Sequence, residues 1–317
     1  MVKFDFSDLS QFDDLIDLRF DYAFKMFFTL GDKILLISLL NAIFANKGIA
    51  RKIENFKIIT PNLEKMSDDD KYSVIDIVAE LDNGETVLIE MHMYELLNIK
   101  AKTIRSWAKS YAEKLLAGQD YVIQPAVIAI TFTDGQVQSL PTSSSAPQLH
   151  RLCKIADVET GEVFSNAMEL HFIDMKLFLA AINHSKKGGK KMQNNQQMIE
   201  ENRILLENAN PNLVRWLSLL TQKGIANKRT LEDICKDDDT MQMAFAYLVW
   251  HSQDAATRKA YTDLREKEDH ERAEKLRMQK EIEDERRKSE QIELEKDKIA
   301  KEFALFRQKV AEQGITL

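Results

Sequence analysis

Two acidic residues on neighbouring apolar segments are the first residues in this chain with the potential for chemistry. Asp76 stands in the run Val74-Ile-Asp-Ile-Val-Ala-Glu-Leu81, and Glu90 stands in Glu85-Thr-Val-Leu-Ile-Glu-Met-His92. Both runs are rich in β-branched residues, and Asp82-Asn83-Gly84 separates them. This pattern predicts a β-hairpin with one acid on each strand.

The length of the turn decides whether these two acids face each other. A two-residue turn would place them on opposite faces of the hairpin. A three-residue turn pairs Leu81 with Glu85, which makes Asp76 the partner of Glu90 and gives Gly84 the left-handed conformation that such turns favour. We predict this second register. The other face would then be one apolar layer of Ile75, Ile77, Ala79, Val87, Ile89 and Met91.

Opposed carboxylates at positions 76 and 90 would repel each other unless a cation lay between them. Mg²⁺ binds through one or two carboxylates and completes its coordination with water and phosphate oxygens. A metal held in this way can activate water and neutralise charge on a phosphate that is being cleaved. Acids are also common on the solvated face of a hairpin, so the pair alone leaves both interpretations open.

The segments around the hairpin predict an α/β fold. Residues 1–15 read as a loosely attached acidic segment, and helices are predicted near 18–27, at 33–44 and at 94–116. Strands are predicted at 56–59, 127–132, 152–156 and 170–173. The run 127–132 is apolar throughout, as expected of a buried central strand. Together these elements predict a mixed sheet flanked by helices.

The chain changes character after residue 184. A Lys/Gly-rich and Gln/Asn-rich stretch precedes residues 198–260, which read as packed helices with Trp216 and Trp250 as core aromatics. From 261 to about 310 the chain is dense in charge and lacks Pro and Gly, so it must be one long helix or disorder. We therefore predict three parts, 1–184, 185–260 and 261–317.

A heptad frame can be drawn on the charged segment. It places Tyr261, Ile282, Phe303 and Val310 at one core position and Leu264, Met278, Ile292, Ile299 and Phe306 at the other. The same frame puts Glu268, Glu271, Lys275, Glu285, Ser289 and Lys296 in the seam. A solitary helix held by i,i+4 ion pairs and a coiled coil that makes a homo-oligomer through residues 262–312 are both open interpretations.

Several short motifs follow one another in a specific order. They are Asp21-x-x-Phe24-Lys25, Leu40-Asn41-Ala-Ile, Ile75-Asp76, Ile89-Glu90-Met91, Arg105 with Tyr111, and Gly118-x-x-Tyr121. In this order and spacing they resemble the PD-(D/E)XK nuclease family of transposase-like, recombination-promoting nucleases. The resemblance is dense over residues 18–180 and looser beyond. It implies a restriction-endonuclease-like fold and a DNA endonuclease that uses Mg²⁺ or Mn²⁺.

The resemblance also implies roles for single residues. Asp76 and Glu90 match the metal-binding acids, and Asp21 matches an acid near the first helix. His92 stands where the family has glutamine or the superfamily has lysine, which orients the attacking water. A neutral histidine could position water as glutamine does, could ligate Mn²⁺, or could mark a site that has lost activity. A further alternative is that His92 only caps the hairpin edge.

The helix predicted at 94–116 carries a net positive charge. Lys102, Arg105 and Lys109 follow one another at i, i+3 and i+7 and therefore share a face. Such a stripe beside the carboxylates would bind DNA phosphates, although an ordinary solvated face is as good an interpretation. Trp107 and Tyr111 are i,i+4 neighbours that we expect in the core.

Composition excludes several other classes of protein. Cys153 and Cys235 have no C-x-x-C partner, which excludes a disulfide framework or zinc ribbon and predicts reduced thiols packed in the core. No apolar run has the length of a membrane span, no leader pattern is recognised, and no Gly-rich phosphate loop indicates ATP. We expect a cytoplasmic protein without a membrane partner. The net charge of −7 does not by itself indicate a nucleic-acid binder.

The sequence thus predicts a metal-dependent DNA endonuclease associated with transposition or recombination. Two alternatives remain open: an inactive protein of the same fold that binds DNA or a protein partner and oligomerises, and a nuclease that acts on RNA.

Overall fold

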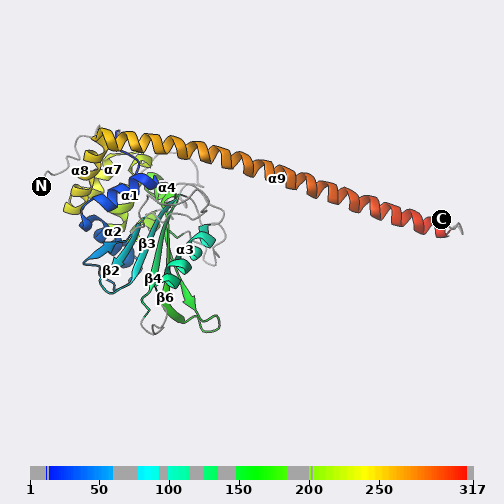
Figure 1. Ribbon diagram of the computed structural model, residues 1–317, viewed down its shortest axis with the longest axis horizontal. Coiled ribbons are helices and arrows are strands. Elements are labelled where there is room, and N and C mark those ends of the chain that lie inside the picture. Colours follow the sequence, from blue (N-terminus) through cyan, green and yellow to red (C-terminus); the bar gives the residue numbers. More distant parts are fainter. Residues whose placement is uncertain are drawn as a thin grey trace. The chain divides into compact units, whose positions relative to one another are not determined.

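The computed structural model describes residues 12, 14–59, 77–92, 99–114, 124–134, 148–184, 200 and 203–312 (Figure 1). The chain divides into two compact units, Met1–Tyr261 and Thr262–Leu317. No single helix in the described ranges is long and apolar enough to cross a membrane, and only two helices bent by 113° meet those criteria together. Asp76 lies outside the described residues.

The described part of the first unit contains six strands in one mixed sheet. Their spatial order is β1 (Phe56–Ile58), β2 (Ile77–Leu81), β3 (Thr86–His92), β4 (Val127–Thr133), β6 (Val163–Asp174) and β5 (His150–Ala156). Strands β3, β4 and β6 run parallel, whereas the outer pairings are antiparallel. Every residue of β4 is buried, which confirms the predicted central strand.

The hairpin of β2 and β3 has the predicted three-residue turn. The backbone N–H of Leu81 donates to the carbonyl of Glu85 at 2.9 Å, and Ile77 pairs with Ile89. Gly84 has φ +80°, the left-handed conformation expected there. A Cβ at position 84 would lie 3.2 Å from Cγ of Pro125, so any larger residue there would also crowd the proline ring. The register predicted from the turn is therefore confirmed over the described residues.

Helices cover both faces of this sheet (Figure 1). The apolar layer formed by Ile77, Ala79, Val87, Ile89 and Met91 packs in one buried cluster with side chains of four helices. These helices are α1 (Asp21–Leu30), α2 (Lys33–Ala45), α6 (Pro211–Leu220) and α8 (Asp239–Gln253). Two further helices, α4 (Met175–His184) and α7 (Arg229–Cys235), also contribute buried residues to it. The predicted apolar layer is confirmed for its described members.

The opposite face carries α3 (Ile99–Glu113). Trp107 and Tyr111 stack with ring centroids 5.2 Å apart and pack on a smaller cluster that includes Val78 and Leu88. The indole N–H of Trp107 donates to the carbonyl of Val127 at 3.1 Å. Both aromatics are therefore partly buried against the core, on the side of α3 that was predicted to face it.

Two sequence expectations were wrong. Phe12 and Leu15 are buried in the main cluster, so this part of the acidic segment 1–15 is packed in the core and is not loosely attached. Trp216 is buried as predicted, but Trp250 is 61% exposed. The buried stripe of α8 has helical spacing and consists of Met241, Ala244, Phe245, Leu248, His251 and Ser252. Trp250 lies off that stripe and stacks on Tyr247 instead.

The charged segment forms one helix, α9 (Ala255–Glu312), of 58 residues. Ion pairs at i,i+4 spacing occur along it, including Arg286 with Glu290 at 2.9 Å. Of the two alternatives for this segment, a long helix or disorder, the structure thus shows the helix.

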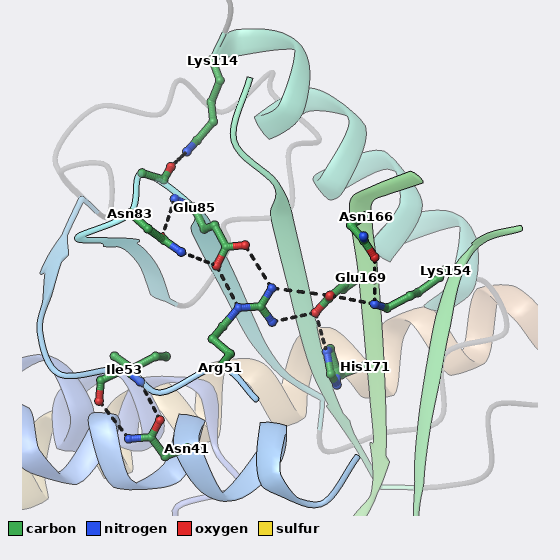
Figure 2. A network of polar contacts seen from close by, with 11 residues as sticks. Asn41, Arg51, Ile53, Asn83, Glu85, Lys114, Lys154, Asn166, Glu169 and His171 are labelled. Carbon is green, nitrogen blue, oxygen red and sulfur yellow. Dashed lines mark hydrogen bonds and ion pairs between the residues drawn. The ribbon is translucent and has the colours of Figure 1, made fainter. Parts of the chain in front are cut away.

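A partly buried ion-pair network joins the segment after α2 to the start of β3 and to β6 (Figure 2). Arg51 lies 2.8 Å from the carboxylate of Glu85 and 2.8 Å from that of Glu169. Lys154 approaches Glu169 to 3.0 Å from β5. Burial alone would raise the pKa of Glu169, but contacts with His171, Arg51 and Lys154 outweigh burial and hold that pKa well below its usual range.

A histidine pair continues this network toward the helices. The amide of Asn46 donates to Nδ1 of His150 at 2.9 Å, so Nε2 of His150 carries the proton that it donates to His171 at 2.9 Å. Nε2 of His171 then faces Glu169 at 3.6 Å. Burial lowers the pKa of His150 to about 2 and also lowers that of His171, so both rings are neutral at pH 7.

Replacing Arg51 by methionine should lower the free energy of unfolding by about 3 kcal/mol, because it leaves a buried carboxylate without its main partner. Urea unfolding followed by circular dichroism measures this. Lys52→Met is the matched control, since the Lys52 side chain is 80% exposed and should leave the midpoint unchanged. Equal effects of both changes would show that the network does not stabilise the fold.

The histidine pair predicts a loss of stability with acid. The pKa of His150 is about 2 in the folded chain but about 6.5 in the unfolded chain, so the unfolded state binds more protons between these values. The free energy of unfolding should therefore fall as pH drops below about 6.5, by up to about 1.4 kcal/mol per pH unit for this ring. His150→Gln should flatten the slope between pH 7 and 5, and His270→Gln on the exposed surface should not. An unchanged slope in His150→Gln would contradict this assignment.

Candidate active site

Glu90 lies near the carboxyl-terminal end of β3, on the face covered by α3. Alternation along the strand turns Leu88, Glu90 and His92 to this face, while Ile89 and Met91 enter the main core. The parallel register places Glu90 beside Thr131 of β4. Its side chain is buried, with only 4% of the residue exposed. A carboxylate so enclosed requires compensating donors.

Three side chains supply those donors. Nε2 of His92 lies 3.0 Å from Oε2 of Glu90, and Nζ of Lys102 lies 3.4 Å from the same oxygen. The hydroxyl of Ser106 donates to Oε1 at 3.0 Å. One donor thus comes from the strand itself and two come from α3.

The protons on this cluster follow from the donor inventory. Lys102 lies 3.3 Å from Nε2 of His92, but an ammonium group can only donate. If Nε2 accepted from Lys102, its lone pair would also face the carboxylate of Glu90. The consistent arrangement has the Nε2–H of His92 and Lys102 both donating to Glu90.

The cluster keeps Glu90 ionised. Burial alone would raise the pKa of this carboxyl group, but the hydrogen bond from His92 and the charge of Lys102 outweigh burial and hold the pKa below its ordinary value. The site therefore combines a buried, ionised carboxylate with the side chains of a histidine and a lysine.

Helix α3 is fixed by a further polar contact with the sheet. The hydroxyls of Thr103 and Thr131 lie 3.2 Å apart and are both buried. This contact and the packed Trp107 set the rotation of the helix, so the half-buried Lys102 reaches Glu90. Arg105 and Lys109 are exposed, and Lys109 lies 4.0 Å from Glu113. Of the predicted basic stripe, the structure thus brings Lys102 to the predicted acid.

Asp21 lies in the first turn of α1, half-buried. Arg19, two residues earlier, reaches Asp134 at 3.8 Å, and the backbone N–H of Asp134 donates to the carbonyl of His92 at 3.0 Å. The segment that leads into α1 is therefore joined to the edge of the sheet where β3 and β4 end. Glu90 and His92 lie close to the same edge.

Asp134 and Asp174 are acids at this edge that the sequence analysis missed. Asp134 directly follows β4, and Asp174 ends β6, where its carboxylate accepts from the backbone N–H of Leu177 at 2.8 Å. Burial raises the pKa of both carboxyl groups. Each acid stands at the end of an apolar run in the sequence, which could have marked it as a candidate. That mark indicates a shared site only when both strands are known to be parallel to β3.

The donors present fit a divalent cation that keeps water or substrate oxygens as ligands. The described residues contain no group of three or more His, Cys, Asp and Glu placed to hold a metal. Glu90 does supply an ionised oxygen donor, and the imidazole of His92 lies against it with Nε2 directed at that carboxylate. Mg²⁺ is commonly bound through only one or two carboxylates, and imidazole also suits Mn²⁺. Asp76, the predicted second acid, lies outside the described residues.

Comparison with protein families matches residues 18–279 to the family described as PD-(D/E)XK nuclease family transposase. The chain belongs to this family. The match covers the whole sheet, α3 and the start of α9, and it confirms the restriction-endonuclease-like α/β fold expected from the sequence motifs. Searches of curated proteins and of solved structures each found no significant match. The site around Glu90 therefore lies within the residues that match a family of nucleases and transposases.

Proposed function

We propose that this protein is a divalent-metal-dependent endonuclease that hydrolyses phosphodiester bonds of DNA during transposition or recombination. The observation that carries the proposal is the contact between Glu90 and Lys102. It provides an ionised acid and a cation, 3.4 Å apart, in a chain of a nuclease family. Residues 1–184 would carry the chemistry, and residues 185–260 would support them through the shared core.

The acids would bind the metal. Glu90 is proposed as one ligand and Asp76 as the second, with Asp21 as a further acid. The observed pairing of Ile77 with Ile89 is the register that this role of Asp76 requires. A bound Mg²⁺ or Mn²⁺ would lower the pKa of a water molecule and neutralise charge on the phosphate.

Lys102 is proposed to supply the positive charge that a lysine at position 92 would provide. Its stem comes from α3 instead of β3, and its amine lies beside both Glu90 and His92. From there the ammonium group can donate to a phosphate oxygen or orient a water molecule. His92 is proposed to hold Glu90 in place and to position water in the manner of glutamine.

The exposed residues of α3 would bind the DNA backbone. Arg105 and Lys109 lie outside the Glu90 cluster, on the solvent side of the helix that supplies Lys102. Phosphate contacts from such residues would set the position of the duplex without reading its sequence.

The proposal predicts cleavage of supercoiled plasmid DNA with Mg²⁺ or Mn²⁺ and none with excess chelator. Glu90→Gln should lower the cleavage rate at least about 100-fold, because it removes the charge that binds the metal. Glu80→Gln is the matched control: the residue lies on the same hairpin face but is exposed. Nicked and linear products on agarose gels measure the rate.

Several outcomes would contradict the proposal. Cleavage that is equal in Glu90→Gln and the natural chain would exclude this site. A folded protein that binds DNA without cutting it in either metal would favour the inactive alternative, and faster cleavage of a matched RNA would identify an RNA nuclease.

Substitutions at Lys102 and Lys109 should affect different steps, the cleavage step for Lys102 and DNA binding for Lys109. Lys102→Met should lower the single-turnover rate about 100-fold at saturating DNA, and Lys102→Arg should restore part of it. Lys109→Met should instead weaken DNA binding and reduce the slope of log affinity against log salt by about one. Filter binding and single-turnover cleavage measure the two effects. The same loss of rate in both variants would refute a special role for Lys102.

A further inference from the structure

The second unit exposes a row of large apolar side chains along α9. Leu264, Met278, Ile282, Ile292 and Ile299 are between 40% and 66% exposed. Leu264, Met278, Ile292 and Ile299 are separated by multiples of seven residues, and Ile282 follows Met278 by four. Positions spaced in this way form the seam of a two-stranded coiled coil. The helix therefore carries an apolar stripe that a second helix can bury.

Charged residues in the same stripe restrict how a second copy can bind. Glu285 and Lys296 occupy seam positions and are exposed in the single helix. A parallel, in-register partner would place Glu285 against Glu285 of the second copy and Lys296 against Lys296. Like charges inside a seam disfavour that arrangement.

An antiparallel partner removes both conflicts. When Ile282 is set against Ile299 of the second copy, the same register sets Glu285 against Lys296 and Ser289 against Ile292. Ile282 and Ile299 then meet each other, Ile292 meets the small uncharged Ser289, and each charged seam residue between 282 and 299 meets its opposite. The two-fold axis of such a pair repeats every contact once.

The residues that flank the seam agree with this register. Arg286 would lie beside Glu293 of the second copy, and Lys288 would lie beside Glu295. These side chains are exposed and carry opposite charges in both pairs. We therefore infer that α9 pairs with α9 of a second copy as an antiparallel coiled coil centred between Ser289 and Ile292.

Charge reversal in the full-length chain tests both the pairing and its direction. Glu285→Lys and Lys296→Glu should each weaken the dimer at least about tenfold, because each places like charges together twice in the pair. The double variant Glu285→Lys/Lys296→Glu should restore dimerisation. Light scattering over a concentration series measures the mass, and circular dichroism checks that the helix is retained. A parallel pair would show neither the loss nor the rescue, because positions 285 and 296 would face like charges in every variant.

Cysteine cross-linking tests the register directly. Seam partners have Cα atoms close enough for a disulfide, whereas Ile282 of one copy would lie about 25 Å from Ile282 of the other. Ile282→Cys and Ile299→Cys alone should stay uncross-linked under mild oxidation, and a mixture of the two should give a covalent dimer on non-reducing gels. Cross-linking of Ile282→Cys with itself would overturn the antiparallel pairing. A dimer unaffected by charge reversal would likewise overturn the antiparallel pairing, and a monomeric mass at all concentrations would overturn pairing through α9.

Discussion

A carboxylate enclosed between a strand and a helix is stable only if donors replace the water that it has lost. Glu90 is in this position, and the arrangement of α3 follows from it. The helix must present Lys102 and Ser106 at the end of β3, and the contact between Thr103 and Thr131 fixes the rotation that does so. The same contacts keep the carboxylate ionised. Stability and the capacity for chemistry therefore depend on one set of interactions.

The two ends of the parallel strands are used differently. Arg51, Glu85 and Glu169 occupy the amino-terminal end, where they join the segment after α2 to the sheet (Figure 2). Together with Lys154, their charges neutralise one another in a closed network, which suits a structural role. At the carboxyl-terminal end Glu90, Asp134 and Asp174 gather acidic groups where parallel sheets usually bind ligands.

The second unit obeys a different constraint. A helix such as α9 can be stable as a solvated helix through i,i+4 ion pairs, and such pairs are present. Those pairs leave its exposed apolar stripe unexplained. The stripe is acidic at Glu285 and basic at Lys296. This order of charges favours an antiparallel second copy, whereas it has no role in a solitary helix.

Local sequence determined a large part of this protein. Apolar alternation on the two strands fixed the hairpin register, because only the three-residue turn brings Ile77, Ala79, Val87 and Ile89 to one face, and Gly84 suits that turn. Apolar period fixed α2 and β4, and the order of short motifs identified the family. The helical spacing of the apolar residues in α8 also places Trp250 off the buried stripe, although Trp250 was predicted to lie in the core.

Tertiary structure alone decided which side chains meet. The strand order makes β3, β4 and β6 parallel neighbours, which brings Asp134 and Asp174 to the edge where Glu90 lies. The pairing of His150 with His171 requires the register of β5 against β6. Lys102 belongs to the active site because of how α3 packs on the sheet, and its spacing from Arg105 and Lys109 could not show this. Period and turn type are local properties of the chain, whereas these contacts join residues far apart in sequence that only packing brings together.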